Sequence, residues 1–349
     1  MSLSNISQVL LRNSDLLTAK HPLLVNLSAD NFLSEYFSLY PESKITCFNT
    51  NFSVHQTLSH NYEHQATFNF SAQYSSDLSH DLVIMSFPKS KAELTFTLAM
   101  LTPYLEKDAQ LLLVGEKNSG IKSSPKLLVD FVEHYQKIDS ARHCMLFSGQ
   151  FKQVNNSFSL DDWYSYYSVK IDDVELKIAS LPGVFSLDGL DKGTELLLRN
   201  LSNEMTGKLL DFGCGAGVIA CYLGKKNASL ELSLLDVSAL ALKSAEETLK
   251  INNLTGKCIA SDSLSNLNEK YDHIVSNPPF HQGVKTNYEA TESFLGGIKK
   301  YINKHGSITI VANSFLQYLP IMEKAIGKTK VLTKENGFTL YQCKVSKIT

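Results

Sequence analysis

The sequence has no long apolar run, no leader-like start and no paired cysteines, and each absence excludes a class of protein. No stretch approaches the roughly 18 consecutive apolar residues that cross a membrane. The start, MSLSNISQVLLRNSDLL, lacks a basic segment followed by a sustained apolar core, so its spacing predicts a short amphipathic helix instead of a secretory signal. The six cysteines form no CxxC pair and no metal-ligand cluster with histidine: Cys47, Cys144, Cys214, Cys221, Cys258 and Cys343. We therefore expect free thiols, no bound metal, no membrane contact and a cytoplasmic location.

The chain also lacks a strong charge of one sign. Its net charge is −2 over 349 residues, which argues against a protein that coats nucleic acid over its whole surface. From residue 285 to residue 349, however, ten lysines stand against four acidic residues. These lysines could contact phosphate, or they could lie solvated on helix faces.

The C-terminal half predicts an α/β fold. Its short apolar segments alternate with segments of helical character, the pattern of a doubly wound, mostly parallel sheet. Ligands of such sheets bind beyond the carboxyl ends of the strands. Helices are expected after the glycine-rich segment GCGAG, at Ala239–Asn252 and at Thr291–Asn303. Strands are expected at Gly207–Asp211, Leu230–Asp236, Lys257–Ala260, Tyr271–Ser276 and Ser307–Ala312.

The N-terminal half repeats this order of segments in weaker form. HDLVIMSFPKS aligns with YDHIVSNPPFH, with Asp81 opposite Asp272, and YLEKDAQLLLVGE aligns with YINKHGSITIVAN. Farther upstream, HPLLVNLSADNF aligns with GKLLDFGCGAG, and KITCFNT aligns with LSLLDVS. The spacings between these blocks differ by only a few residues, which loops absorb. The sequence therefore predicts a tandem duplication of one Rossmann-like domain.

The two copies differ where a ligand would bind. A loop without glycine cannot bring its backbone equally close to a ligand, so the first copy is predicted to keep the fold without a cofactor site. In this alignment the first copy has Asn26, Ser28 and Asp30 opposite Asp211, Gly213 and Gly215, and Ser86 and Phe87 opposite Asn277 and Pro278. We expect domains at residues 1–160 and 181–349.

Residues 161–180 predict a connecting β-hairpin. The segment DDWYSYYSVKIDDVELKIAS has two alternating stretches around an Asp-Asp pair. Its aromatic residues could stack on bases or pack against a domain: Trp163, Tyr164, Tyr166 and Tyr167.

The segment DFGCGAG (211–217) follows a predicted strand and opens a predicted helix. A dinucleotide site would carry its third glycine at position 218, where this chain has Val218, and the third glycine falls one residue early. That spacing favours S-adenosylmethionine, which has no pyrophosphate to bind. Asp236 ends the next strand, where a carboxylate can accept both ribose hydroxyls, and Asp262 follows the third strand, where it could meet the adenine amine or cap a helix.

The segment NPPF (277–280) directly follows another predicted strand. An exocyclic amine on an aromatic ring is a poor nucleophile, because its lone pair is delocalised into the ring. The side-chain oxygen of Asn277 and the carbonyl of Pro278 could accept both N–H bonds and free that lone pair, with tandem prolines fixing the backbone. Phe280 could stack on the base, and His281 could contact the substrate or serve structure only.

These motifs together resemble the bacterial small-subunit ribosomal RNA guanine-N2 methyltransferase C family of class I methyltransferases. The resemblance rests on LPGVFSLDGLDKGTELLL, LLDFGCGAG, VSNPPFHQG and IVANSFLQYLP, and it is close from about Leu181 to Lys344. The N-terminal half fits by its length and by its decayed duplicate, which that family also carries. The resemblance implies two methyltransferase-like domains, the second with a mostly parallel seven-stranded sheet.

The resemblance also implies an activity and further site residues. It implies methyl transfer from S-adenosyl-L-methionine to N2 of one guanine in 16S rRNA, within the 30S subunit, by a monomer. The target guanine would be swung out of its stack to reach the motif. The segment PGVFS…LDKGT would close over the cofactor and place Phe185 and Thr194 near it, and Pro279 would lie at the substrate.

Other substrates remain open for the same chemistry: a large-subunit guanine N2, an adenine N6 or a protein glutamine N5. The last two classes often carry Tyr where this chain has Phe280. A non-catalytic RNA-binding assembly factor is a further alternative. Intact glycines at 213, 215 and 217, with Asp236 and Asn277, argue against it.

Overall fold

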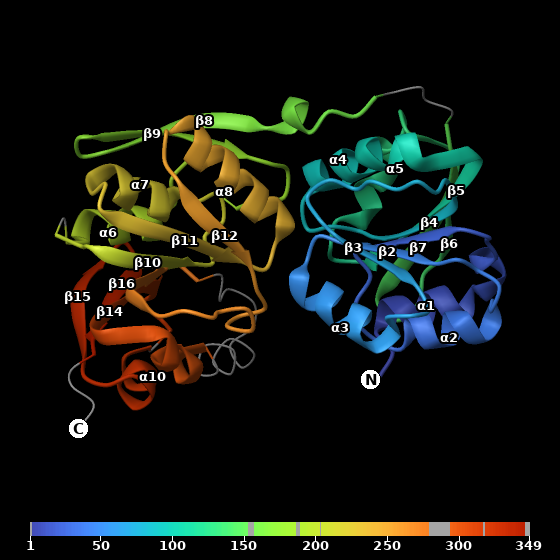
Figure 1. Ribbon diagram of the computed structural model, residues 1–349. Coiled ribbons are helices and arrows are strands. Elements are labelled where there is room, and N and C mark those ends of the chain that lie inside the picture. The colour runs from blue at the N-terminus through green and yellow to red at the C-terminus, as the bar shows by residue number, and fades with distance from the viewer. Residues whose placement is uncertain are drawn as a thin grey trace. The chain divides into compact units, whose positions relative to one another are not determined.

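The computed structural model divides into two compact units, Met1–Trp163 and Tyr164–Thr349. Residues 2–152, 157–185, 189–202, 204–278, 294–316 and 318–345 are described. Each unit contains a mostly parallel sheet of seven described strands with helices on both faces (Figure 1). The predicted α/β fold with two Rossmann-like domains is confirmed. Every helix among the described residues is too short or too polar to span a lipid bilayer.

The second unit carries its sheet in the order β12-β11-β10-β13-β14-β16-β15. Neighbouring strands from β12 to β14 are parallel, and β16 runs antiparallel to both β14 and β15. The strands of this sheet are β10 (Gly207–Phe212), β11 (Leu230–Asp236), β12 (Gly256–Ala260), β13 (Tyr271–Ser276), β14 (Ile302–Asn313), β15 (Thr329–Glu335) and β16 (Phe338–Lys344). The helical elements are α6 (Lys192–Asn200), α7 (Val218–Lys226), α8 (Ala239–Ile251), η5 (Lys299–Tyr301) and α10 (Tyr318–Ala325), with residues 294–298 also helical.

Two apolar layers sandwich this sheet. Helices α7 and α8 pack on β10, β11 and β12, and α6 packs on β14, β15 and β16. Residues 294–298 and α10 form the other layer with one face of the central strands, through buried side chains that include Phe212, Ile274, Phe294, Ile308, Ile310, Tyr318 and Met322. Burying both faces explains why these strands read as nearly continuous apolar runs in the sequence.

The first unit repeats the topology strand for strand, in the order β3-β2-β1-β4-β5-β7-β6. Its strands are β1 (Pro22–Val25), β2 (Thr46–Asn49), β3 (Thr67–Phe70), β4 (His80–Ser86), β5 (Leu105–Glu116), β6 (Val132–Asp139) and β7 (Cys144–Phe151). Its helices are α1 (Asn5–Arg12), α2 (Phe32–Leu39), α3 (Phe52–Tyr62), α4 (Lys91–Leu101) and α5 (Ser124–Leu127), with short 3-10 segments η1 (Ser14–Leu17), η2 (Thr102–Tyr104), η3 (Ile121–Ser123) and η4 (Leu160–Trp163). The duplication predicted from the sequence is therefore visible in the connectivity.

Two local details are also shared by the copies. The carboxylate of Asp81 accepts the backbone N–H of His21 at 2.9 Å, and that of Asp272 accepts the backbone N–H of Lys208 at 2.8 Å. Asp108 in β5 and His305 in β14 both have a positive φ, at +66° and +71°, where each long strand is irregular. The Asp81–Asp272 equivalence inferred from the sequence therefore has a structural basis, because both carboxylates bind the chain that enters the central strand.

The strand registers correct the upstream alignment of the copies. Leu24 pairs with Ile84 as Asp211 pairs with Val275, so Leu24, and not Asn26, lies opposite Asp211. The predicted equivalences of Asn26, Ser28 and Asp30 to Asp211, Gly213 and Gly215 were therefore wrong by two positions. Asn26 occupies the place of Gly213, and both residues have a positive φ. The backbone N–H of Asn26 donates to the carbonyl of Phe48, and that of Gly213 donates to the carbonyl of Leu235. By the same register Asn49, and not Phe48, lies opposite Asp236.

In the first unit, side chains of the same unit bind the loop that corresponds to the glycine turn of the second unit. The side-chain oxygen of Asn26 accepts the backbone N–H of Thr50, and the carboxylate of Asp30 accepts from Ser4 and Ser7 at the start of α1. A small cleft remains beside this loop, lined by Leu24, Leu27, Ser28, Asp30, Phe32, Leu33, Cys47, Asn49 and Leu58.

The hairpin of β8 (Ser165–Ile171) and β9 (Val174–Ser180) belongs to the second unit, where it packs across α7 and α8 (Figure 1). Three polar residues spaced four apart on α8 and its C-terminus bind the outer edge of β9. Thr248 both accepts from and donates to the backbone of Ala179, at 3.1 and 3.2 Å. Asn252 does the same with Lys177, and Ser244 accepts the N–H of Leu181. This ladder fixes the hairpin on the helix.

Candidate functional site

The glycine turn and the first two residues of the NPPF segment, Asn277 and Pro278, lie at the carboxyl ends of two neighbouring parallel strands. Asp211 in β10 pairs with Val275 in β13. Gly213 lies two residues after Asp211, and Asn277 lies two residues after Val275, so the two residues leave the sheet at the same level. Adjacent strands lie about 5 Å apart. The hydroxyl of Ser276 donates to the carbonyl of Phe212 at 2.7 Å and ties the two strand ends together. The two motifs therefore face one common space at this edge of the sheet.

The three glycines of the turn all have a left-handed backbone, with φ of +71°, +52° and +80° at 213, 215 and 217. A Cβ at Gly217 would lie 3.0 Å from the Leu234 side chain and 3.1 Å from that of Ala245, so this glycine allows α7 to approach α8. A Cβ at Gly215 would meet nothing within 4 Å. The backbone at Gly215 therefore borders open space that a ligand can enter.

Asp211 lies beneath this turn and is fully buried. One carboxylate oxygen accepts the backbone N–H of Ala220 in α7 at 3.0 Å, and the other has no partner among the described residues. Burial raises the pKa of Asp211 to about 7.

Asp236 ends β11 and joins the turn directly. One carboxylate oxygen accepts the N–H of Gly215 at 3.0 Å, and the other accepts the N–H of Ser238 at 2.9 Å. Burial raises the pKa of Asp236 despite these bonds. The side chain is partly exposed, and each oxygen keeps a second lone pair, so it can still accept hydroxyl groups.

The turn fits S-adenosylmethionine by two observations: the open space in front of Gly215, and the unpaired buried oxygen of Asp211. Asp262 lies two residues beyond β12 in an exposed turn in which Ser265 donates its backbone N–H to the carbonyl of Asp262. The side chain of Phe185 is 64% exposed. Both residues lie at the protein surface.

The amide of Asn277 is held by α6. Its Nδ2 lies 3.1 Å from Oδ1 of Asp191 and 2.9 Å from Oγ1 of Thr194. Thr194 is buried, and so is Pro278. The predicted roles of Pro279, Phe280 and His281 fall on residues outside those that the structure describes.

Sequence reasoning did not single out Asp191. The only indication in the sequence is that Asp191 is an acidic residue directly before a helix, which is the N-cap position. That pattern predicts the cap, which forms with the backbone N–H groups of Gly193 and Thr194, but not the contact with a residue 86 positions away.

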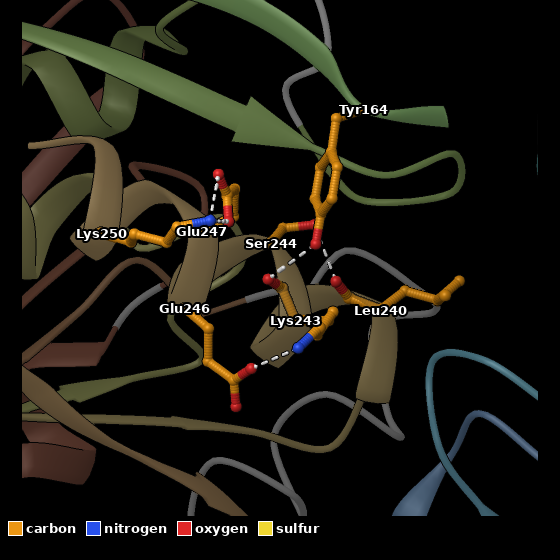
Figure 2. A network of polar contacts seen from close by, with 7 residues as sticks. All are labelled: Tyr164, Leu240, Lys243, Ser244, Glu246, Glu247 and Lys250. Atoms are coloured by element: carbon orange, nitrogen blue, oxygen red, sulfur yellow. Dashed lines mark hydrogen bonds and ion pairs between the residues drawn. The ribbon is translucent and has the colours of Figure 1, made fainter. Parts of the chain in front are cut away.

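The aromatic run of the hairpin is divided between several contacts. Trp163 packs edge-on against Phe96 in the first unit, and the Tyr164 hydroxyl donates to the carbonyl of Lys243 on α8 (Figure 2). Tyr166 is 46% exposed, with the ammonium of Lys177 5.0 Å from its ring centre. The Tyr167 hydroxyl is buried, and burial together with the negative charge of Asp191 raises its pKa to about 12. The packing alternative therefore accounts for Trp163 and Tyr164.

Known proteins match this chain over nearly its whole length. Residues 175–342 match the family described as "Methyltransferase small domain", and residues 7–167 match "Methyltransferase small domain N-terminal". A ribosomal RNA small subunit methyltransferase C from Colwellia psychrerythraea is 54% identical over 99% of both chains. Its counterpart from Pseudoalteromonas translucida is 42% identical over 97% of this chain and 98% of the relative.

A solved structure shares the fold of the full chain. The T. thermophilus 16S rRNA N2 G1207 methyltransferase (RsmC), solved with AdoMet and guanosine, aligns with a TM-score of 0.80 at 21% identity. The alignment covers 98% of this chain and 92% of that one. The resemblance inferred from the motifs is thereby confirmed: the chain belongs to the ribosomal RNA small subunit methyltransferase C family.

Proposed function

We propose that this chain methylates the exocyclic N2 amine of one guanine in 16S rRNA, with S-adenosyl-L-methionine as donor, and that it acts as a monomer on the 30S subunit. The observation that carries the proposal is the pairing of β10 with β13, which brings Gly213 and Asn277 to one edge of the sheet. The names of the curated relatives support a small-subunit rRNA substrate. The name of the T. thermophilus protein, which shares the fold, supports guanine N2.

The acceptor end of the site suits a planar amine. Asn277 Oδ1 and the Pro278 carbonyl accept the two N–H bonds of the target amine, which favours a pyramidal nitrogen with a free lone pair. Phe280 stacks on the base, with Pro279 and His281 beside it. Alignment is the main requirement for attack on a methyl group, so the site needs no separate strong base.

The part of the site that would bind the methyl donor consists of the glycine turn and the acidic residues around it. The backbone at Gly213, Gly215 and Gly217 would lie against the cofactor, with Asp211 beneath the turn, Asp236 binding the ribose and Asp262 binding the adenine amine. Phe185, from the segment before α6, and Thr194, at the start of α6, would border the cofactor. When bound, S-adenosylmethionine would supply an electrophilic methyl group to the amine nitrogen and leave as the neutral thioether S-adenosylhomocysteine, while the methylated nitrogen would lose one N–H proton to solvent.

The substrate is tested by methyl transfer from labelled cofactor to 30S subunits, free 16S rRNA, 50S subunits and release factors. We expect incorporation into 16S rRNA, strongest in 30S subunits, and mass mapping of the RNA should find one N2-methylguanine. Label confined to 50S subunits or to protein would overturn the substrate assignment. Light scattering of the purified protein alone should give the mass of one chain.

The acceptor role is tested by Asn277→Ala. Loss of one preorganised acceptor should lower the methylation rate about 100-fold, while calorimetry finds the same cofactor affinity as for the unchanged protein. A variant that turns over at the normal rate would remove Asn277 from the mechanism.

The donor role is tested by Gly215→Val. The new side chain would project into open space at the turn and is expected to abolish cofactor binding in calorimetry. Gly327→Val is the matched control, because Gly327 also has a positive φ and open space around its Cβ but lies before β15, at the opposite end of the sheet. Equal cofactor affinity in the two variants would refute the loop assignment.

A further inference from the structure

The side-chain amide of Asn277 uses both of its N–H bonds within the chain. Its Nδ2 lies 3.1 Å from Oδ1 of Asp191 and 2.9 Å from Oγ1 of Thr194. A primary amide carries two donors on nitrogen and an acceptor on oxygen. With one N–H directed at each partner, the donor side of Asn277 faces α6 and its oxygen faces away from these two groups.

The orientation of this amide determines whether it can recognise an amine. A rotation of 180° about the last torsion exchanges the oxygen and the nitrogen of the amide with almost no change of shape. In one orientation Asn277 offers an acceptor to a target NH2 group, and in the other it offers a second donor, which an NH2 group cannot satisfy. An ionised carboxylate only accepts, so Asp191 allows just one of the two orientations.

The anchoring groups are themselves held in place. Asp191 is the N-cap of α6, and its Oδ1 also accepts the backbone N–H groups of Gly193 and Thr194 at 3.0 and 3.1 Å. A Cβ at Gly193 would lie 3.0 Å from the Phe338 ring and 3.1 Å from Oδ1 of Asp191, so a side chain there would require one of these groups to move by a few tenths of an ångström. Thr194 is 6% exposed, which leaves its hydroxyl little freedom. The first turn of α6 is thus a rigid frame.

We infer that Asp191 and Thr194 are positioning residues that keep the oxygen of Asn277 directed at the target amine. The inference rests on the proposed function for the identity of that amine. It assigns a role to the DKGT segment beyond bordering the cofactor. Loss of one anchor leaves Asn277 in place but weakens the preference for this orientation of its amide, so the fraction of enzyme with a usable acceptor falls.

The kinetic test compares Thr194→Val with Thr194→Ser. Valine keeps the volume and the helix but removes the acceptor for Nδ2, whereas serine keeps the hydroxyl. We expect Thr194→Val to lower kcat about 10-fold, with KM for 30S subunits nearly unchanged, and Thr194→Ser to restore most of the rate. Asp191→Ser retains a helix-capping oxygen on a shorter side chain and should lower kcat in the same way.

A double-mutant cycle separates positioning from general stability. If Thr194 acts only through Asn277, Thr194→Val should have no further effect on kcat in the Asn277→Ala background. A purely structural role would instead lower the rate by the same factor in both backgrounds. Additive losses, or a normal kcat for Thr194→Val, would overturn the inference.

A readout that needs no substrate keeps the inference distinct from the proposed function. The side-chain NH2 signals of Asn277, assigned by their loss in Asn277→Ala, should exchange slowly with water in the full chain and at least 10-fold faster in Thr194→Val. Equally fast exchange in both proteins would refute the anchoring. If slow exchange holds but the Asn277→Ala variant methylates RNA normally, the proposed function fails while the anchoring stands.

Discussion

The replacement Thr248→Val tests the ladder that holds the β8–β9 hairpin on α8. Valine has nearly the shape of threonine, so the change removes the hydroxyl and little else. In the native chain this hydroxyl accepts the N–H of Ala179 and donates to its carbonyl, and both residues are fully buried. The variant therefore leaves one buried peptide donor and one buried acceptor without partners.

The expected loss follows from these two groups. Leaving a buried donor or acceptor unpaired costs about 1–3 kcal/mol, so the pair should destabilise the docked hairpin by about 2–6 kcal/mol. Amide hydrogen exchange of Ala179 measures this opening locally, and we expect it to accelerate by about 30-fold or more. Thr248→Ser keeps the hydroxyl and serves as control, with exchange close to that of the native chain. If Ala179 exchanges at the same rate in Thr248→Val, the reasoning about unpaired groups is refuted.

Two further changes test the catalytic unit. Burial raises the pKa of Asp211 to about 7, so the folded chain holds a proton there that the unfolded chain releases near pH 4. Stability should therefore fall by up to about 4 kcal/mol as the pH rises from 4 to 7, and Asp211→Asn should flatten that part of the profile in denaturant titrations. Gly193→Ala would place a methyl group 3.0 Å from the Phe338 ring and 3.1 Å from Asp191, so we expect a loss of about 1–3 kcal/mol in the same titration and slower methyl transfer. A flat native pH profile, or a fully stable and active Gly193→Ala, would contradict these readings.

Strand positions could be predicted from the sequence where an apolar run has clear ends. The predictions for Leu230–Asp236 and Tyr271–Ser276 coincide with β11 and β13. The helix predicted at Thr291–Asn303 was wrong at its end, because β14 begins at Ile302. The polar segment there reads as a turn in the sequence, yet it continues the strand through an irregularity at His305, whose φ is +71°. Single-residue irregularities of this kind leave no periodic signal.

The register between the two copies was harder to predict for a physical reason. Side chains in a strand alternate between faces, so sliding an alignment by two residues changes no face and leaves the apolar pattern intact. The misplaced pairing of Asn26 with Asp211 is an error of this kind. In β2 all four residues are buried, so even a shift by one residue left the pattern unchanged.

The candidate site also has features that could be predicted from the sequence and one that could not. The positions of Gly213, Gly215, Gly217, Asp236 and Asn277 at the strand ends could be predicted from the sequence, because their residue types are tied to strand ends and to backbone conformations that glycine adopts. The contact of Asp191 with Asn277 could not be, because it depends on how α6 packs against the sheet.

The contacts around Asn26 show what would be needed to build a ligand site into the first unit. A glycine at position 26 would relieve only one obstacle, because Asp30 would still be tied to Ser4 and Ser7 at the start of α1. Leu24 would still present an apolar side chain where the active copy has a carboxylate. A ligand site in the first unit would therefore require changes at several positions together.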